Sequence, residues 1–248
     1  MKPTILVHHT ADQLAAAAAA RLITRLVDLQ SDGLIPSVAL TGGGVGTATL
    51  REVAASAARD AVDWRAVEIF WGDERFVPAE SDDRNEKQAR EALLDHVPVN
   101  PDLVHAMAPQ GGPFGDDPDA AAASYARLLG ERAPLDIVLL GMGAEGHVAS
   151  VFPHSPELRA SGSVVAVRDC PKPPPTRVSM TLPTIQAAAE VWLLVAGAGK
   201  AEAVGRALGG AADDEVPAAG AHGVIQTLWM LDRAAASQIP PGPEDLPV

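Results

Sequence analysis

Three segments of this sequence combine residue types that could carry out chemistry, and one of them surrounds a histidine. The segment GMGAEGHVASVFPHSP, residues 141–156, places Gly141, Gly143 and Gly146 in the spacing G-x-G-x-x-G immediately before His147. The spacing is typical either of a dinucleotide-binding turn or of a loop whose glycines let the backbone approach a ligand while His147 points into the same cleft. An imidazole titrates near neutral pH, so it can take a proton from water and return it to a departing oxygen.

The length available after the third glycine disfavours the dinucleotide turn. Such a turn needs that glycine in the first turn of a long helix, whose amino terminus holds the pyrophosphate. Pro153 comes seven residues after Gly146 and leaves room for about two helical turns, although Asp169 stands where a ribose-binding acid would be expected. The sequence therefore favours a loop that presents His147, either for catalysis or as a histidine that caps the next short helix.

The segment TGGGVGT, residues 41–47, follows an apolar strand and precedes a helix. The backbone amides of Gly42, Gly43 and Gly44, together with the helix dipole, would suit a phosphate. No G-K-[ST] sequence follows, so the turn does not predict a nucleoside triphosphate site. The alternative is a tight strand-to-helix connection without a ligand.

Charged residues follow the next apolar strand in FWGDERFVP, residues 70–78. Arg75 could clamp a phosphate or carboxylate with its planar guanidinium, and Asp73 could orient it or accept sugar hydroxyls. The alternative is a surface salt bridge. Three more cations lie near the ends of expected elements, where an isolated charge is more often solvated: Arg84, Arg177 and Lys200.

Composition limits the class of protein and its partners. The 248 residues are 47% apolar and 21% charged, as in a soluble globular protein. A net charge of −13 argues against nucleic-acid and membrane partners, because both need a dense cationic surface. The single cysteine, Cys170, and the lack of a signal-peptide pattern indicate a cytoplasmic protein. The seven histidines form no H-x-x-x-H pair or Cys/His cluster, so no metal is expected.

The elements that must position these segments alternate along the chain. Helices are expected at residues 11–30, 47–59, 83–96 and 117–131, the last with an Asp-Pro start. Apolar strands are expected at residues 35–41, 67–71, 136–140, 164–167, 177–182, 191–196 and 224–231.

This alternation predicts an α/β fold with an open, mainly parallel sheet and helices on both faces. Ligands bind beyond the carboxyl ends of such strands, so the loops after Leu40, Trp71, Leu140 and Ala196 should converge on one site. Residues 1–238 are expected to form a single domain and residues 239–248 a loose tail. The prolines at 171 and 173–175 are expected to make a loop rigid.

Taken together, the segments resemble those of the 6-phosphogluconolactonases. LTGGG, FWGDERFVP with SDDRN after it, LDIVLLGMGAEGHVASVFP, PPPTRVSMTLP and GAGKAEAV occur in that family's order from about residue 5 to residue 231. The resemblance implies a Rossmann-like three-layer sandwich of the glucosamine-6-phosphate deaminase and ribose-5-phosphate isomerase type. It also implies hydrolysis of a phosphosugar lactone, 6-phospho-D-glucono-1,5-lactone, in the oxidative pentose phosphate pathway, without a cofactor, by a monomer or small homo-oligomer.

The implied reaction assigns roles to the segments. His147 would deprotonate the attacking water and protonate the departing ring oxygen. The oxyanion would be met by amides around Gly143 or by Arg75, and the order of the cations is left open. The remaining expected substrate-binding residues are Gly42, Gly43, Gly44, Asp73, Arg177 and Lys200.

Three positions depart from the family pattern. Glu145 replaces the usual Asp, Val148 stands where Thr is frequent, and Val45 removes a hydroxyl from the glycine turn. The closest rival is a phosphosugar isomerase or deaminase, which would be expected to show a DEY-type segment where this chain has DERFVP. A non-catalytic sugar-phosphate sensor would need an attached domain, for which one α/β pattern leaves no room.

Overall fold

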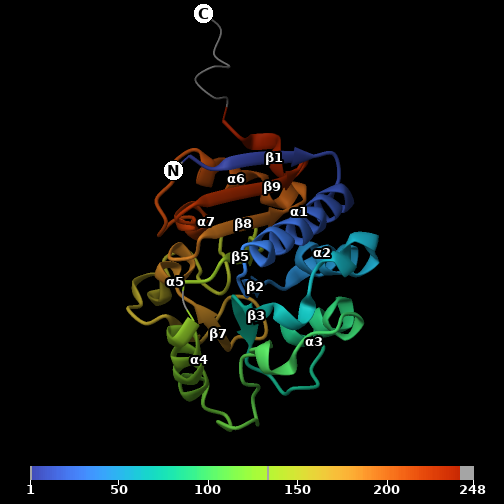
Figure 1. The fold of residues 1–248 in the computed structure, drawn as a ribbon. Helices are drawn as coiled ribbons and strands as arrows, with labels where there is room; N and C mark the ends of the chain where they lie inside the picture. Colours follow the sequence, from blue (N-terminus) through green and yellow to red (C-terminus); the bar gives the residue numbers. More distant parts are fainter. Residues whose placement is uncertain (1, 133, 241–248) are drawn as a thin grey trace, which may run out of the picture.

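A computed structural model of the chain describes residues 2–132 and 134–240. A six-stranded sheet runs through the centre of the molecule (Figure 1), and each of its strand pairs is parallel. The strands, in spatial order, are β1 (Thr4–His8), β9 (Gln226–Asp232), β8 (Glu190–Val195), β5 (Ile137–Leu140), β2 (Ser37–Leu40) and β3 (Glu68–Trp71). The expectation of a mainly parallel sheet is confirmed.

Helices cover both faces of this sheet, which makes three layers (Figure 1). One face packs on α1 (Ala11–Ser31), α2 (Gly43–Ala55) and α3 (Asn85–Ala92). The other packs on α4 (Pro118–Arg132), α5 (Leu182–Gln186), α6 (Ala201–Leu208) and α7 (Pro217–Gly220). Alternate residues of each strand enter the two cores, as Ile137 and Val138 of β5 do, because successive side chains of a strand point to opposite faces.

A second, antiparallel sheet of three short strands was not expected from the sequence. Its order is β4 (Asp73–Arg75), β7 (Arg177–Met180) and β6 (Val164–Val167). From the sequence, WGDERFVP at residues 71–78 is expected to form a loop. This expectation is wrong for Asp73–Arg75, whose backbone pairs with β7 in the register Arg75 to Arg177. This pairing fixes the charged segment instead of leaving it free at the surface.

The starts of two expected helices can be compared with the structure. The expected helix at 47–59 begins earlier, at Gly43, so the glycine turn forms the first turn of α2. The helix expected from residue 117 is confirmed, since Asp117 Oδ1 accepts from the backbone N–H groups of Asp119 and Ala120 at 3.0 and 3.1 Å. Single 3₁₀ turns occur at Ala57–Ala61, Trp64–Ala66, Leu94–His96, Pro101–Leu103, Pro156–Arg159, Ala198–Lys200 and Ala235–Gln238.

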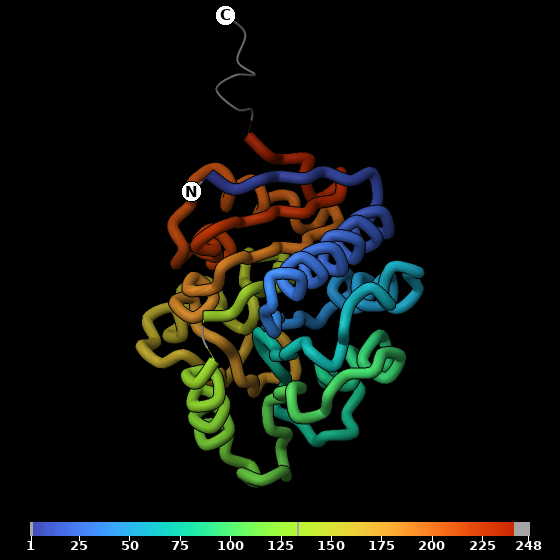
Figure 2. Tube along the Cα trace, viewed as in Figure 1, coloured from blue at the N-terminus to red at the C-terminus, as the bar shows by residue number. Residues whose placement is uncertain are grey.

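The first and last strands of the chain lie side by side at one edge of the large sheet. Figure 2 shows β1 running beside β9, and their register pairs Thr4 with Leu228. Ile239, the first residue of the expected tail, packs against the core, while residues 241–248 of that tail lie outside the described residues. In the part of the chain that the structure describes, no helix has the length and apolarity to cross a membrane.

Candidate active site

Four loops from the carboxyl edge of the large sheet meet around a cavity of about 160 Å³. Thr41 follows β2, Asp73 follows β3, Gly141 follows β5 and Lys200 follows β8, and all four line this cavity. The predicted convergence of these loops is confirmed. Of the expected site residues, the structure brings Gly42, Gly43, Asp73, Arg75, Gly143, His147, Arg177 and Lys200 to the cavity wall. Gly44 is in the first turn of α2 but is not part of that wall.

His147 is paired with a carboxylate and stacked on an aromatic ring. Its Nδ1 lies 3.0 Å from Glu145 Oε1, and its ring stacks on Phe152 with 4.4 Å between centroids. Lys172 Nζ donates to Glu145 Oε2 at 2.9 Å and lies 3.4 Å from His147 Nδ1. The imidazole is therefore held by two neighbours while it faces the cavity.

The surroundings of the pair favour a neutral imidazole beside an ionised carboxylate. Burial and the positive charge of Lys172 lower the pKa of His147, although Glu145 and Asp73 oppose them. Burial raises the pKa of Glu145, but the hydrogen bond from Lys172 and the nearby charges outweigh it and bring that pKa to about 2. An uncharged imidazole next to a carboxylate is suited to accept a proton near neutral pH.

Gly143 makes room for the histidine. A Cβ atom at this position would lie 1.9 Å from His147 Nδ1, closer than any side chain tolerates. Its backbone N–H donates to the His147 carbonyl at 2.9 Å. The expectation that the Gly143 amide would meet an oxyanion is therefore wrong for this amide, because it is already bonded within the loop.

The amino terminus of α2 opens into the cavity beside Gly42 and Gly43. Gly42 is the N-cap residue, and among the described residues no side chain accepts a capping hydrogen bond at this end, so the first amides of the helix are available as donors. Gly42 packs against Asn85, whose Oδ1 atom would lie 1.9 Å from a Cβ at that position. A side chain at Gly42 would thus displace Asn85 from the wall.

Asp73 is buried and held by neighbours on three elements. Ser150 Oγ donates to Asp73 Oδ2 at 2.6 Å, Asn85 Nδ2 donates to the Asp73 carbonyl at 2.9 Å, and Arg177 Nη1 lies 3.8 Å from Oδ2. The surface salt bridge considered from the sequence is replaced by this buried network. Asp73 consequently has a fixed orientation toward the cavity.

The two arginines of the site differ in how many of their donors are occupied. Arg75 donates from Nη1 to the Asp83 carbonyl at 2.5 Å, while its buried Nε has no hydrogen-bond partner among the described residues. Arg177 donates from Nε to the Pro174 carbonyl at 2.8 Å and from Nη2 to the Lys172 carbonyl at 3.1 Å. Most of the Arg177 guanidinium therefore binds the backbone of the segment at residues 172–174. The Arg75 side chain, which donates only to Asp83 among the described residues, lines the cavity.

Lys172 and Asn85 line the cavity and were not identified from the sequence. Asn85 is buried, with an Oδ1 atom that lacks a partner in the described part of the chain. The motif SDDRN contains Asn85 and the proline run follows Lys172, but neither sequence pattern assigns a chemical role.

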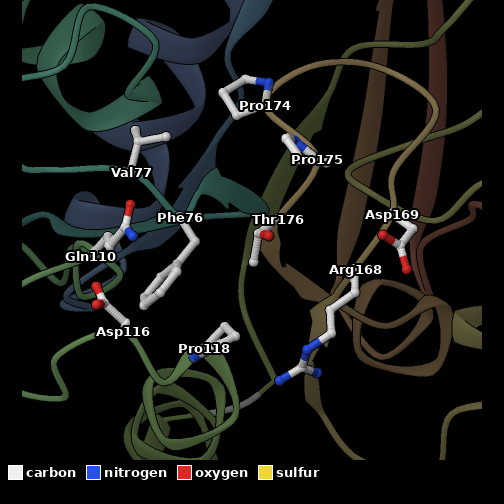
Figure 3. A pocket seen from close by; sticks show the side chains of 10 residues that line it. All are labelled: Phe76, Val77, Gln110, Asp116, Pro118, Arg168, Asp169, Pro174, Pro175 and Thr176. Atoms are coloured by element: carbon white, nitrogen blue, oxygen red, sulfur yellow. The ribbon is translucent and has the colours of Figure 1, made fainter.

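The proline segment also borders a larger cavity of about 450 Å³. Figure 3 shows Pro174, Pro175 and Thr176 following one another along its wall, between Phe76 on one side and Arg168 on the other. Residues 172–177 therefore separate this space from the smaller cavity, which Lys172 and Arg177 line.

A parallel sheet with a polar, cation-lined cavity at its carboxyl edge defines an α/β enzyme of the kind that binds small anionic ligands. The family model described as glucosamine-6-phosphate isomerases/6-phosphogluconolactonase matches residues 9–229. The chain belongs to this family.

Three individual proteins of similar sequence or fold were compared with this chain. A 6-phosphogluconolactonase of Streptomyces coelicolor is 50% identical over 248 residues, which cover 96% of this chain and 95% of the relative. The solved 6-phosphogluconolactonase from Trypanosoma brucei is 30% identical with a TM-score of 0.82, covering 96% of this chain and 99% of that one. A monomeric glucosamine-6-phosphate deaminase of the NagB superfamily has a TM-score of 0.80 at 21% identity, covering 95% of this chain and 99% of that one. At this identity the likeness shows a shared fold only.

Proposed function

We propose that this protein is a 6-phosphogluconolactonase, which hydrolyses 6-phospho-D-glucono-1,5-lactone to 6-phospho-D-gluconate in the oxidative pentose phosphate pathway. The observation that carries the proposal is the His147–Glu145 pair, joined at 3.0 Å, in a cavity lined by four cations: Arg75, Lys172, Arg177 and Lys200. Relatives of that name that are 50% and 30% identical over nearly the whole chain support it. The reaction needs water and uses no cofactor.

His147 acts as the general base. With its Nδ1–H donating to Glu145, the lone pair of Nε2 is left to accept a proton. Water attacks the lactone carbonyl as its proton passes to Nε2, and a tetrahedral oxyanion forms. The oxyanion then collapses, the bond from the carbonyl carbon to the ring oxygen breaks, and Nε2 returns the proton to that oxygen.

Two of the four cations, Lys200 and Arg75, meet the two negatively charged groups of the reacting lactone. The phosphate lies at the amino terminus of α2, beside Gly42 to Gly44, where free amides and the helix dipole favour an anion and Lys200 adds a charge. Arg75, whose side chain lines the same cavity as His147, meets the oxyanion. Asp73 accepts from the sugar hydroxyls, and Arg177 supports it from 3.8 Å.

A coupled assay tests the activity. Glucose 6-phosphate and its dehydrogenase generate the lactone in place, excess 6-phosphogluconate dehydrogenase consumes the product, and the second reduction of NADP is followed with and without this protein. His147→Ala should lower kcat by roughly 10² to 10⁴-fold if proton transfer is its role. His96→Ala, an exposed histidine on a separate 3₁₀ turn, is the matched control and should keep full activity.

Two outcomes would contradict the proposal. A trace that follows spontaneous hydrolysis alone would reject the lactonase and direct attention to glucosamine 6-phosphate and ribose 5-phosphate as substrates. If His147→Ala still accelerates hydrolysis, the lactonase activity would stand and the assignment of His147 as the general base would be rejected. The proposal includes a monomer or small homo-oligomer in the cytoplasm. A single cysteine, Cys170, which is buried and forms no disulfide, fits a reducing compartment.

A further inference from the structure

Lys172 occupies a position that none of the proposed catalytic steps requires. Its Nζ atom donates to Glu145 Oε2 at 2.9 Å and lies 3.4 Å from His147 Nδ1, so it contacts both members of the pair. Glu145 thereby uses one oxygen for the imidazole and the other for the ammonium. The Lys172 side chain is 43% exposed, yet it is directed to this pair instead of extending into water, where its ammonium would be well hydrated.

The backbone that carries Lys172 is fixed from the opposite side. Arg177 of β7 donates to the carbonyls of Lys172 and Pro174, and β7 is itself paired with β4. Pro174 and Pro175 face the larger cavity (Figure 3), so the segment is a wall between two open spaces. Arg177 thus links the position of Lys172 to the strand that carries Asp73.

We propose that Lys172 is a positioning residue of this site, which holds Glu145 against His147 and balances its charge. The inference rests on the proposed lactonase function, since it assigns a role to Lys172 in the same reaction. Lys172 acts through Glu145 and His147; it is not assigned a bond to the phosphate.

The charges that face His147 come from three segments. Glu145 on the same loop and Asp73 on β4 raise the pKa of the imidazole, while burial and Lys172 on the proline segment lower it. Removing Lys172 would remove a positive charge that opposes the effect of Glu145 and Asp73 on the pKa of His147. The imidazole would then hold its proton to a higher pH and lose its ability to accept one from water.

The decisive measurement is the titration of His147 by NMR in protein with isotope-labelled histidine, where His147→Ala identifies the signal. In Lys172→Met the pKa of His147 should rise above that of the unaltered protein, and Lys172→Arg should restore it. Arg168→Met is the matched control, because Arg168 is exposed, lies in the same β6–β7 connection and pairs with Asp119 away from the site. Its His147 titration should not change.

Steady-state kinetics supply the second readout. In Lys172→Met the acid limb of kcat/KM should move to higher pH, and in Glu145→Gln to lower pH. At neutral pH the kcat of Lys172→Met should fall by up to roughly 10²-fold, the effect of a misplaced reacting group, with KM little changed. Arg168→Met should keep the kcat, KM and pH profile of the unaltered protein.

The outcomes separate this inference from the proposed function. An unchanged His147 titration in Lys172→Met, or a raised KM with kcat intact, would overturn the positioning role and assign Lys172 to substrate binding. A shifted titration in a protein without lactonase activity would reject the proposed function and keep the charge coupling. A raised pKa together with a lowered kcat supports both.

Discussion

Two histidines of this molecule have nearly the same immediate partners. His147 Nδ1 lies 3.0 Å from Glu145, and its ring stacks on Phe152; His105 Nε2 lies 2.7 Å from Glu68, and its ring lies 4.7 Å from that of Phe70. The two histidine side chains are equally exposed, at 17%. Partner type, ring contact and burial therefore do not distinguish His147, the proposed catalytic histidine, from His105.

The difference lies in what surrounds each pair. Glu68 is the first residue of β3, 3% exposed, and it also accepts Arg132 Nε at 3.0 Å, so its charge is satisfied within the fold. The His147 pair lies at the other end of the sheet, where four cations line a cavity. A pair whose charge is satisfied within the fold stabilises it, while a pair beside an open, cation-lined cavity has room for a ligand.

The largest expected effect comes from replacing each histidine with alanine, because one replacement should lower activity and the other should lower stability. His147→Ala should remove roughly 10² to 10⁴-fold of kcat and leave stability close to that of the unaltered protein. His105→Ala should keep its activity and lose about 1 to 3 kcal/mol of unfolding free energy, because Glu68 stays buried with one partner fewer. The coupled assay and urea unfolding measure the two quantities. Equal losses of activity in both variants would end the distinction.

The next effect tests the space beside the active pair. In Gly143→Ala the new Cβ would lie 1.9 Å from His147 Nδ1 and 2.7 Å from Glu145 Oε2, so the pair must shift. We expect kcat to fall by roughly 10²-fold, as for other small displacements of reacting groups. Gly130→Ala on α4 is the control: nothing lies within 4 Å of its Cβ, and it should keep its activity and gain up to about 1 kcal/mol of stability. Full activity in Gly143→Ala would show that the pair tolerates movement.

A smaller effect is expected on KM, which should depend on a cation at the carboxyl end of the sheet and not on one at the amino end. Lys200→Met should raise KM by about 10 to 10²-fold with kcat nearly unchanged, since a hydrogen bond to a charged group contributes about 1.5 to 3 kcal/mol. Arg25→Met removes the partner of Glu190 at the amino end and should leave KM as it is. Initial rates over a range of substrate concentrations give kcat and KM for both variants. A lowered kcat in Lys200→Met would instead place this residue at the reacting carbon.

The smallest effect is the position of the acid limb. In the proposed mechanism the neutral form of His147 is the base. Burial and Lys172 lower the pKa of His147, so the midpoint of kcat/KM should lie below about 6.5, the ordinary histidine value. Glu145, with a pKa of about 2, stays ionised throughout this range. His105→Ala should leave the midpoint where it is. A limb above 6.5 would mean that the carboxylates dominate over burial and Lys172.

The sequence predicts the parts of the site that follow from strand order. Apolar strands separated by helices dictate a parallel sheet, and a parallel sheet brings the loops after Leu40, Trp71 and Leu140 to one edge. His147 and the glycine turn are therefore placed correctly before any coordinates exist. The likeness in sequence to a known family adds the reaction, which loop positions alone do not contain.

The remaining parts depend on contacts between distant segments. Strand β4 has three residues and forms because β7, about a hundred positions later, pairs with it. Lys172 reaches Glu145 because Arg177 binds the carbonyls of its segment, which no local pattern encodes. Arg84 was expected to be solvated, yet it is fully buried, with Nη2 donating to the Met107 carbonyl at 2.7 Å.

The four cations of the small cavity belong to a chain whose net charge is −13. In dilute buffer the Debye length is about 30 Å at 0.01 M, so the net negative charge of the whole molecule acts on an approaching phosphate ester and repels it. At physiological ionic strength that range shrinks to about 8 Å, so only the mouth of the cavity acts on the ester. Added salt should first speed the encounter and slow it only when it screens the cavity itself, the reverse of the usual order for an enzyme with a cationic site.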